Sequence, residues 1–537
     1  MPRRPVPLCD ADARGVGRRV LLVFPRYSPS FGTFEYAFPL VGAKAFMPPQ
    51  GLLVVAAALP LGWQARFVDE NLGAANDNDL AWAEVVFVSG MHVQRRQIND
   101  INRRAHAAGR VTVLGGPSVS ASPEHYPDFD YLHLGELGDA TEALFNRLAA
   151  DIARPDAQVV LGTQRRRELA DFPQPAYELA DLKRYFMGSI QFSSGCPYDC
   201  EFCDIPALYG RVPRLKTPAQ LCAELSKLRA CGLGEVIYFV DDNLIANRRA
   251  LRDLLPALIA WQRANGYPFR FACEATLNIA KRPELLEAMR EAGFQTVFCG
   301  IETPEADALQ AMDKAHNLMV PLLEGVRRLN AYGFEVVSGI IMGLDTDTPA
   351  TPQRILDFIE ASQIPMLTIN LLQALPRTRL WNRLAAEGRL TTDERLESNV
   401  RFRRPYEEVV EGWRGCVATA YAPEALFSRY QHQIGATYPH RFAPPRKFSW
   451  ADLGRGLTIL VKVLWACGVI APYRREFWRF AWPRLRKFDI ERVISVGLVA
   501  HHLLSFAREA SEGRQNASFY SAKVTPTSER HVLADAA

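Results

Sequence analysis

Up to residue 384 the chain alternates short apolar runs with longer amphipathic segments, and the remainder has only helical periodicity. Within residues 18–150, five runs have the continuous apolar character of buried parallel strands, at 19–25, 65–71, 85–91, 111–117 and 131–136. The segments between them, such as 49–59 and 95–108, have the periodicity of helices. This alternation predicts a doubly wound, Rossmann-like sheet whose ligand lies beyond the carboxyl ends of its strands.

A second alternating region, residues 186–384, predicts a separate domain. A first strand near Gly188 is followed by apolar strands at 236–243, 270–277, 296–303, 336–344 and 367–376. These units predict a partial (βα)6 barrel with its site at the strand ends. Between the two domains, residues 151–185 contain DFPQPAYELADL and are predicted to form a proline-containing linker.

Residues 385–512 are predicted to form a helical region that faces a membrane or a lipid, and residues 513–537 a disordered tail. The apolar stretch 449–508 is interrupted by Lys462, Pro472 and an arginine pair, and no run reaches the roughly 20 apolar residues of a membrane span. Residues 440–492 hold 12 Lys and Arg against 4 Asp and Glu, and four of the nine tryptophans. We therefore expect peripheral attachment to the inner face of the cytoplasmic membrane. The alternative is a helical cap that packs onto the barrel.

The composition is that of a globular cytoplasmic protein. Of 537 residues, 48% are hydrophobic, and the net charge of +4 favours neither disorder nor general nucleic-acid binding. The basic N-terminal segment lacks the apolar core of a signal peptide, so we do not expect export. Ten cysteines fit a reducing compartment.

Three of those cysteines, Cys196, Cys200 and Cys203, have the spacing C-x3-C-x2-C in one short loop after an apolar strand. Cysteine sulfur binds iron–sulfur clusters, and three thiolates on a [4Fe-4S] cubane leave one iron open to a small molecule. A structural zinc site would need a fourth Cys or His, yet no His lies between Tyr185 and Arg229. A disulfide does not suit three neighbouring cysteines in a cytoplasmic chain. We therefore expect a cluster that takes part in chemistry.

This loop closely resembles that of the radical S-adenosylmethionine (SAM) enzymes. In that family the open iron binds the methionine part of SAM, and one electron splits the sulfonium to a 5'-deoxyadenosyl radical. The aromatic residue before the last cysteine, here Phe202, then packs near the adenine. The resemblance also implies contacts from the barrel strand ends to SAM. Asp241, Asp242 and Asn243 would contact its amino group, and Glu274 and Glu302 its ribose and methionine parts. Gly339 and Gly343 would flank the adenine. Each of these could otherwise be an ordinary residue at a strand end.

The Rossmann-like domain in front of this loop resembles the cobalamin-binding domain of the B12-dependent radical SAM class. Ser89, Gly115 and Gly116 match the Ser and Gly-Gly segments that surround the nucleotide tail of cobalamin. The cobalt-ligating motif D-x-H-x-x-G is absent, and the loop after the first strand, RYSPSFGTFEY, has no histidine. We therefore expect cobalamin without a protein histidine on cobalt, and at His92 a polar contact rather than a ligand.

Longer segments resemble the methylases that act on C-2 of hopanoids, over residues 20–520. They include FPRYSPSFGTFEYAFPL, AFMPPQGLL, DIPALYGRVPRLKTP and INLLQALPRTRLW. The resemblance implies a methyltransferase for an unactivated carbon of a polycyclic triterpenoid lipid. In such an enzyme one SAM methylates cobalamin, and a second yields the radical that removes a hydrogen atom from the substrate. It also implies an electron donor such as flavodoxin or ferredoxin.

A radical route suits a saturated carbon, because that carbon offers no nucleophile that SAM could methylate directly, and the cofactors supply this chemistry. Three alternatives stay open. They are methylation of another hopanoid position, lipid or natural product; a B12 radical rearrangement; and a non-catalytic cobalamin-binding sensor. The intact cysteine triplet argues against the sensor, since a sensor needs no open iron.

Overall fold

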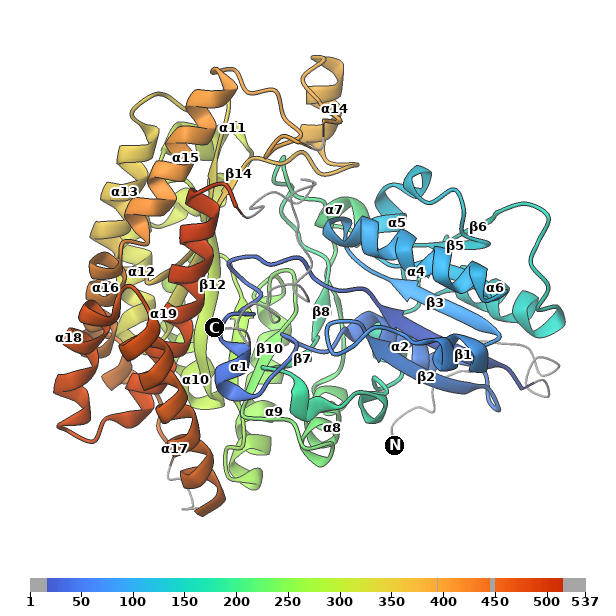
Figure 1. The fold of residues 1–537 in the computed structure, drawn as a ribbon, viewed down its shortest axis with the longest axis horizontal. Helices are drawn as coiled ribbons and strands as arrows, with labels where there is room; N and C mark the ends of the chain where they lie inside the picture. The colour runs from blue at the N-terminus through green and yellow to red at the C-terminus, as the bar shows by residue number, and fades with distance from the viewer. Residues whose placement is uncertain (1–16, 394, 445–449, 515–537) are drawn as a thin grey trace.

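The structure is a computed structural model that describes residues 17–393, 395–444 and 450–514. It contains two six-stranded parallel sheets, and a helical region lies on the side of the second sheet that faces away from the first (Figure 1). The predicted disordered tail lies outside the described residues from 515 onward, so that prediction stays untested.

The first sheet has the strand order β2-β1-β3-β4-β5-β6, and the order doubles back between β1 and β3. That reversal is the place where doubly wound sheets bind ligands. Its inner strands are mostly apolar because helices cover both faces, α2 and α6 on one and α3, α4 and α5 on the other. The strands are β1 (Arg19–Phe24), β2 (Gln64–Asp69), β3 (Val85–Ser89), β4 (Val111–Gly115), β5 (Tyr131–Leu134) and β6 (Val159–Gly162). The helices are α1 (Phe38–Val41), α2 (Gln50–Ala58), α3 (Asp77–Trp82), α4 (Arg95–Ala107), α5 (Pro117–Ala121) and α6 (Asp139–Ala150).

The sixth strand corrects the predicted domain boundary. β6 lies inside the predicted linker 151–185 and pairs in parallel with β5, Tyr131 opposite Val159. Its four residues alternate between half-buried and exposed, as an edge strand does, so they lack the continuous apolar run of the inner strands. The first sheet therefore extends to residue 162, and only the segment after it connects the two sheets.

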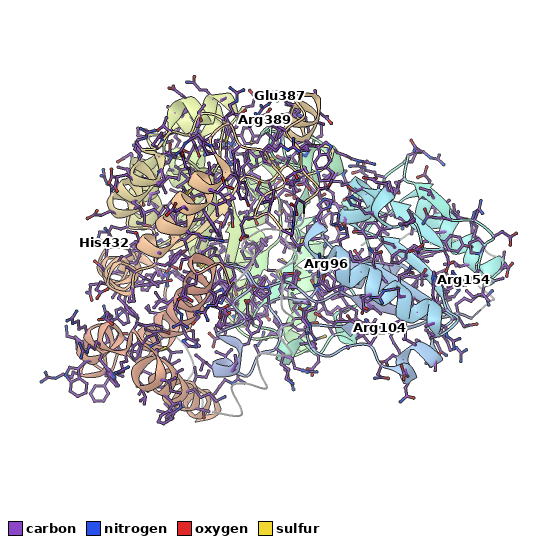
Figure 2. The ribbon with its side chains drawn as sticks, turned by 45° about the horizontal axis from the view of Figure 1, so that its top comes forward. Arg96, Arg104, Arg154, Glu387, Arg389 and His432 are labelled. Atoms are coloured by element: carbon purple, nitrogen blue, oxygen red, sulfur yellow. The ribbon has the colours of Figure 1, made fainter. Side chains whose placement is uncertain are left out.

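Charged contacts tie two segments to the edges of the first sheet. Arg104 of α4 donates to the carboxylate of Glu70 over 2.5 Å, and Arg154 donates to that of Asp130 over 2.9 Å. Figure 2 shows both arginines on the first domain. A second group of charged side chains, which includes Glu387 and Arg389, lies over the barrel (Figure 2).

The second sheet has the order β7-β10-β11-β12-β13-β14, so each strand pairs with the next and the two edges, β7 and β14, stay unpaired with each other. This is the predicted partial (βα)6 barrel. Its strands are β7 (Gly188–Ile190), β10 (Val236–Phe239), β11 (Arg270–Glu274), β12 (Phe294–Glu302), β13 (Glu335–Met342) and β14 (Met366–Leu371). Its helices are α7 (Ile205–Leu208), α8 (Pro218–Ala230), α9 (Arg248–Asn265), α10 (Pro283–Ala292), α11 (Ala306–Ala311), α12 (Leu322–Ala331) and α13 (Thr351–Ser362). A small antiparallel pair, β8 (Ser193–Ser194) with β9 (Arg214–Leu215), follows β7.

The chain after the barrel is helical, as predicted. It forms α14 (Arg379–Ala386), α15 (Tyr406–Ala420), α16 (Pro423–Ala436), α17 (Trp450–Trp465), α18 (Arg474–Leu485) and α19 (Ile490–Ser511). Helices α15 to α19 share one hydrophobic core with the barrel.

The last helix also reaches back to the first domain. The imidazole Nε2 of His502 lies 3.1 Å from the carbonyl oxygen of Ser30 and donates to it, and the Tyr36 hydroxyl donates to the Glu509 carboxylate over 2.6 Å. The loop after β1 is therefore held by the C-terminal end of the described chain.

Two helices are long and apolar enough to cross a membrane by length and composition, Leu453–Ile470 and Ile490–Ser511. The expectation that no segment reaches this length was based on the interruptions at Lys462, Pro472 and the arginine pair. The window Leu453–Ile470 ends before Pro472, and its two charges, Arg455 and Lys462, still leave its mean hydropathy at 1.7. Within these windows 22% and 61% of the residues lie buried in the fold. The second helix is mainly a core helix, whereas most of the first is uncovered.

Candidate active site

The three cysteines lie on the loop between β8 and α7, after the first barrel strand. Gly195 begins this loop with a φ of 98°, and a Cβ there would lie 2.9 Å from the carbonyl oxygen of Gly210, so only glycine fits. The Cys196 N–H donates to that same carbonyl over 3.2 Å, and the Cys203 N–H donates to the Cys200 carbonyl over 3.1 Å. These bonds fold the three thiols into one compact turn.

All three thiols are partly buried. Burial raises the pKa of Cys196, raises that of Cys200 to about 11, and raises that of Cys203 further. Metal binding would deprotonate them, because the thiolate is the ligand. Among the described residues no set of three His, Cys, Asp and Glu side chains is arranged to hold one metal ion. In a cubane each thiolate binds a different iron, so convergence on one point is not required.

β10 ends at the three polar residues expected at the amino group of SAM. The buried Asp241 carboxylate accepts from the Ser193 N–H over 2.5 Å and from its hydroxyl over 2.6 Å, so it supports the backbone that enters the cysteine loop. Asp242 accepts from the Gly195 N–H over 2.7 Å, and burial raises the pKa of Asp242 to about 7. The Nδ2 group of buried Asn243 has no hydrogen-bond partner among the described residues. It lies near the Cys196 thiol and acts to lower the pKa of that thiol. Asn243 therefore keeps a buried donor available to a ligand.

The next two strands end in carboxylates inside the barrel. Glu274 accepts from the Tyr238 hydroxyl over 3.1 Å, and burial raises the pKa of Glu274 to about 7. Glu302 has a φ of 66°, which is rare for a residue other than glycine, and its carboxylate accepts from the Lys314 ammonium group over 2.6 Å. A Cβ at Gly300 would lie 2.3 Å from that carboxylate, so this glycine makes room for the buried ion pair.

Phe202, expected near the adenine, packs between apolar residues of α14 and α11. The Lys314 ammonium group lies 5.3 Å from the centre of the Phe202 ring. Gly343 has a φ of 93°, and a Cβ there would lie 2.5 Å from the Phe402 ring. A Cβ at Gly339 would lie 3.4 Å from the Glu302 carboxylate. The two glycines therefore keep β13 close to its neighbours.

A cavity of about 810 Å³ lies between the carboxyl ends of the two sheets. Residues of the first domain form one wall, among them Ser89, Gly115, Gly116, Gly135 and Glu136. Barrel residues form the opposite wall, among them Tyr238, Asp242, Glu274, Phe298, Thr368 and Asn370. The loop after β1 and Phe506 of α19 complete it. One cavity thus joins the ligand-binding edge of the Rossmann-like sheet to the mouth of the barrel.

The first-domain residues lie together at this cavity. Ser89 and Gly115 are opposite each other on β3 and β4, and Gly116 has a φ of 94°. A Cβ at Gly116 would lie 2.3 Å from the Ser89 hydroxyl oxygen, so only glycine fits there, and the two glycines and the small Ser89 side chain form a cradle with an accessible backbone. His92 is not among the lining residues; its Nδ1 lies 3.4 Å from the Ser118 hydroxyl.

The cavity wall therefore contains five of the predicted residues, namely Ser89, Gly115, Gly116, Asp242 and Glu274. The cysteines, Phe202, Asp241, Asn243, Glu302, Gly339 and Gly343 are not among its lining residues. All of them except Gly339, which lies within β13, are at the same end of the barrel. Sequence reasoning missed Tyr238 and Lys314. Tyr238, a polar residue within the apolar run of β10, was a usable signal. Lys314 follows α11 without any periodic pattern, and only the fold brings it to Glu302.

Comparison with known proteins defines the class. Residues 190–359 match the radical SAM superfamily model, and residues 378–516 match a domain of unknown function. The solved structure of the cobalamin-dependent SAM radical enzyme OxsB, with aqua-cobalamin and SAM bound, covers 96% of this chain and 83% of its own with a TM-score of 0.58 and 14% identity. That likeness shows the fold alone. The molecule is thus a radical SAM enzyme with a Rossmann-like domain in front of its barrel.

Two relatives then define the family. The hopanoid C-2 methylase of Rhodopseudomonas palustris (strain TIE-1) is 57% identical over 96% of this chain and 98% of its own length. An uncharacterized methyltransferase of Synechocystis sp. (strain ATCC 27184 / PCC 6803 / Kazusa) is 35% identical over 91% and 92%. The chain belongs to the hopanoid C-2 methylase family. This confirms the predicted radical SAM methyltransferase class and the predicted fold.

Proposed function

We propose that this enzyme uses a [4Fe-4S] cluster, SAM and cobalamin to methylate an unactivated ring carbon of a polycyclic triterpenoid lipid, at C-2 of a hopanoid. Identity of 57% to the hopanoid C-2 methylase over nearly the whole chain carries the proposal. The single cavity between the two sheets supports it, because a methyl carrier and a radical source must both reach one substrate carbon.

The residues present fit these groups. Cys196, Cys200 and Cys203 would hold the cluster, and the free amide donor of Asn243 beside them would meet SAM. The cradle at Gly116 would take cobalamin, together with its neighbours Ser89 and Gly115. When bound, these groups supply a carbon radical and a transferable methyl group.

The chain itself supplies position and a water-poor cavity. Large apolar side chains, among them Phe87, Phe145 and Phe298, line much of the cavity and exclude water from a reactive radical. Burial raises the pKa of Glu274 to about 7, so at neutral pH its protonated and ionised forms are both accessible, and the protonated form presents a neutral side chain to an apolar substrate. Tyr238 fixes its orientation by donating to the carboxylate.

Lipid analysis tests this function. A host that makes hopanoids without a methylase of its own should accumulate hopanoids one methylene unit heavier at C-2 when this gene is expressed, as seen by mass spectrometry and retention against standards. A methyl group at another ring position, or on another lipid, would support the corresponding alternative. Unchanged lipids in cells that hold soluble, cluster-loaded protein would refute the assignment.

We further propose that the enzyme takes its electron from a flavodoxin or ferredoxin and works on the inner face of the cytoplasmic membrane. Support for the second statement comes from α17 and the π-helical turn Ala466–Ile470 that continues it, where apolar residues four apart are exposed: Leu453, Leu457, Val461, Trp465 and Val469. This spacing puts them on one helix face. The opposite face is buried through Leu460 and Val463 against α19 and the core, so lipid cannot surround the helix. Such a helix suits interfacial attachment rather than a span.

Vesicle binding tests the membrane proposal. The exposed cations Arg474, Arg475 and Arg479 belong to α18, which packs against the π-helical turn after α17, and each basic residue near an anionic surface contributes about 1 kcal/mol. Anionic liposomes at low salt should sediment the protein, and changing the three arginines to Glu should weaken binding by about tenfold or more. The same change at the exposed Arg248, Arg249 and Arg252 of α9 is the matched control. Equal supernatant fractions with anionic and neutral vesicles would mean that the lipid arrives by another carrier.

A further inference from the structure

The cysteine loop is held from outside by α14, the first helix of the region whose family model has no known function. The contacts converge on Glu201, which directly follows Cys200. Its N–H donates to the Met312 carbonyl over 3.0 Å, and its carbonyl accepts from the Leu380 N–H of α14 over 2.9 Å. Both backbone groups of this residue are therefore bonded to segments outside the loop.

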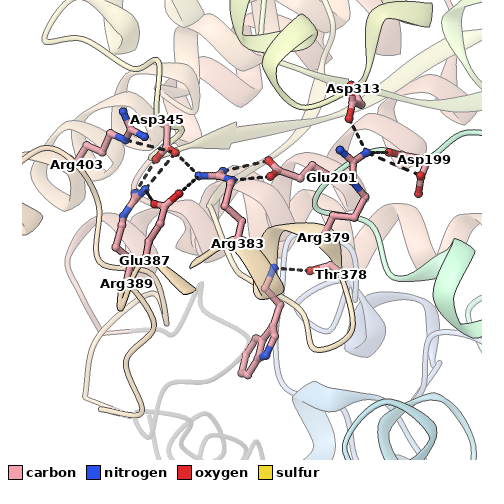
Figure 3. Close-up of polar contacts among 11 residues, drawn as sticks. Asp199, Glu201, Asp313, Asp345, Thr378, Arg379, Arg383, Glu387, Arg389 and Arg403 are labelled. Carbon is pink, nitrogen blue, oxygen red and sulfur yellow. Dashed lines mark hydrogen bonds and ion pairs between the residues drawn. The ribbon is translucent and has the colours of Figure 1, made fainter. Parts of the chain in front are cut away.

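The side chain of Glu201 is fixed as well. Arg383 of α14 donates to its two carboxylate oxygens, from Nε over 2.6 Å and from Nη2 over 3.1 Å, and donates from Nη1 to Asp345 over 2.7 Å (Figure 3). Asp345 also accepts from Arg389 over 2.6 Å. Two parallel hydrogen bonds between guanidinium and carboxylate are stronger and more directional than one. The Glu201 side chain is 14% exposed and that of Arg383 is 34% exposed, so water screens the pair in part and the two-pronged geometry carries the contact.

A second arginine of α14 makes a weaker contact with the same loop. Arg379 donates to the Asp313 carboxylate over 2.5 Å and lies 3.8 Å from that of Asp199 (Figure 3). Its side chain is 54% exposed, so this pair contributes little. Lys314 is the buried cation on the inner side of the turn from Cys200 to Cys203, and Arg383 is the principal cation that binds this turn from α14.

The position of α14 explains why this contact exists. The barrel sheet is open, with β7 at one edge and β14 at the other. The cysteine loop follows β7, and α14 follows β14, so their contact bridges the open side of the barrel at the end where the cysteines lie. A closed barrel would need no such bridge, whereas here it keeps the loop in place.

We propose that Arg383 is a positioning residue for the iron–sulfur cluster, which fixes the Cys200–Cys203 turn through Glu201 and neutralises the carboxylate beside the cluster. This inference rests on the proposed cluster. Reduction adds an electron, so an uncompensated carboxylate nearby makes the cluster harder to reduce, and net charge is one of the factors that set its potential. Arg383 therefore makes the cluster easier to reduce and harder to lose.

Redox titration of the reconstituted protein tests this, because the two partners should act with opposite sign. Arg383→Gln should shift the cluster midpoint potential to a more negative value, since the Glu201 charge is left unpaired. Glu201→Gln should shift it to a more positive value. The double variant should return close to the parent. Arg383→Lys keeps the charge without the two-pronged geometry, so it should keep the parent potential but lose iron to a chelator faster.

A matched control is Arg328→Gln on α12, which removes an exposed pair with Glu324 remote from the loop and should leave both quantities unchanged. A purely structural role would give shifts of the same sign in both single variants, or none, and either result overturns the proposal. If Arg383→Gln does not fold, the other two variants still test the proposal. A positive shift of the midpoint potential in Glu201→Gln and faster iron loss in Arg383→Lys would support it, and the absence of both would contradict it. A parent protein without a [4Fe-4S] electron paramagnetic resonance signal would instead refute the proposed function.

Discussion

Replacing Cys200 with alanine will abolish the formation of 5'-deoxyadenosine from SAM. A cubane held by three thiolates has one open iron, which is the position that binds SAM. With only two thiolates on this turn, the cluster would be lost or would have two open irons. The same result is expected for Cys196 and Cys203. Release of 5'-deoxyadenosine under reducing conditions, measured by chromatography on reconstituted protein, gives the result directly.

The control for this experiment is Cys222→Ala, which removes a partly buried thiol on α8 whose hydrogen bond runs to the Ala257 carbonyl. That variant should keep its iron and cleave SAM at the parent rate. A Cys200→Ala protein that does the same would mean that the loop does not carry the cluster.

Replacing Gly116 with alanine should weaken cobalamin binding by at least about tenfold, or roughly 1.4 kcal/mol. The new Cβ would lie 2.3 Å from the Ser89 hydroxyl and would stand in the cradle where the ligand approaches the backbone. Cobalamin retained per chain, read from its visible absorbance after gel filtration, measures the effect. Iron content should not change, because the cysteine loop is on the other domain.

Gly109→Ala separates crowding from backbone strain. Gly109 has a φ of 72°, so alanine there also meets a positive-φ penalty, of about 1–2 kcal/mol in the left-handed region, but its Cβ would have no neighbour within 4 Å. This variant should lose some stability and keep its cobalamin. Equal loss of cobalamin in both variants would show that strain, and not the cradle, is responsible.

The strands of both sheets were predictable because an inner parallel strand must be apolar on both faces, which leaves a continuous run such as β1. Strand β6 was not predictable from the sequence. It is an edge strand of four residues that alternates between exposed and half-buried positions, so its sequence resembles that of a linker. The domain boundary drawn at residue 150 failed for that reason.

Within the candidate site, the cysteine triplet was predictable because its chemistry is encoded in local spacing. Lys314 was not, because its partner Glu302 meets it only through the fold. Asp241 shows a different limit. It was expected at a cofactor, yet its carboxylate bonds to the Ser193 backbone, and no pattern along the chain distinguishes such a supporting carboxylate from a ligand-binding one.

The contacts of α19 with the loop after β1 join residues that are more than 470 positions apart, His502 to Ser30 and Glu509 to Tyr36. Such pairings close very long loops, and this costs chain entropy before the contacts contribute any favourable free energy. They therefore form late in folding. During synthesis the N-terminal domain folds first, and the cavity wall that Phe506 completes cannot exist until the last helix leaves the ribosome. A nascent chain therefore exposes the apolar interior of its own cavity, and cofactor loading into the finished cavity has to wait until α19 has been made and has packed.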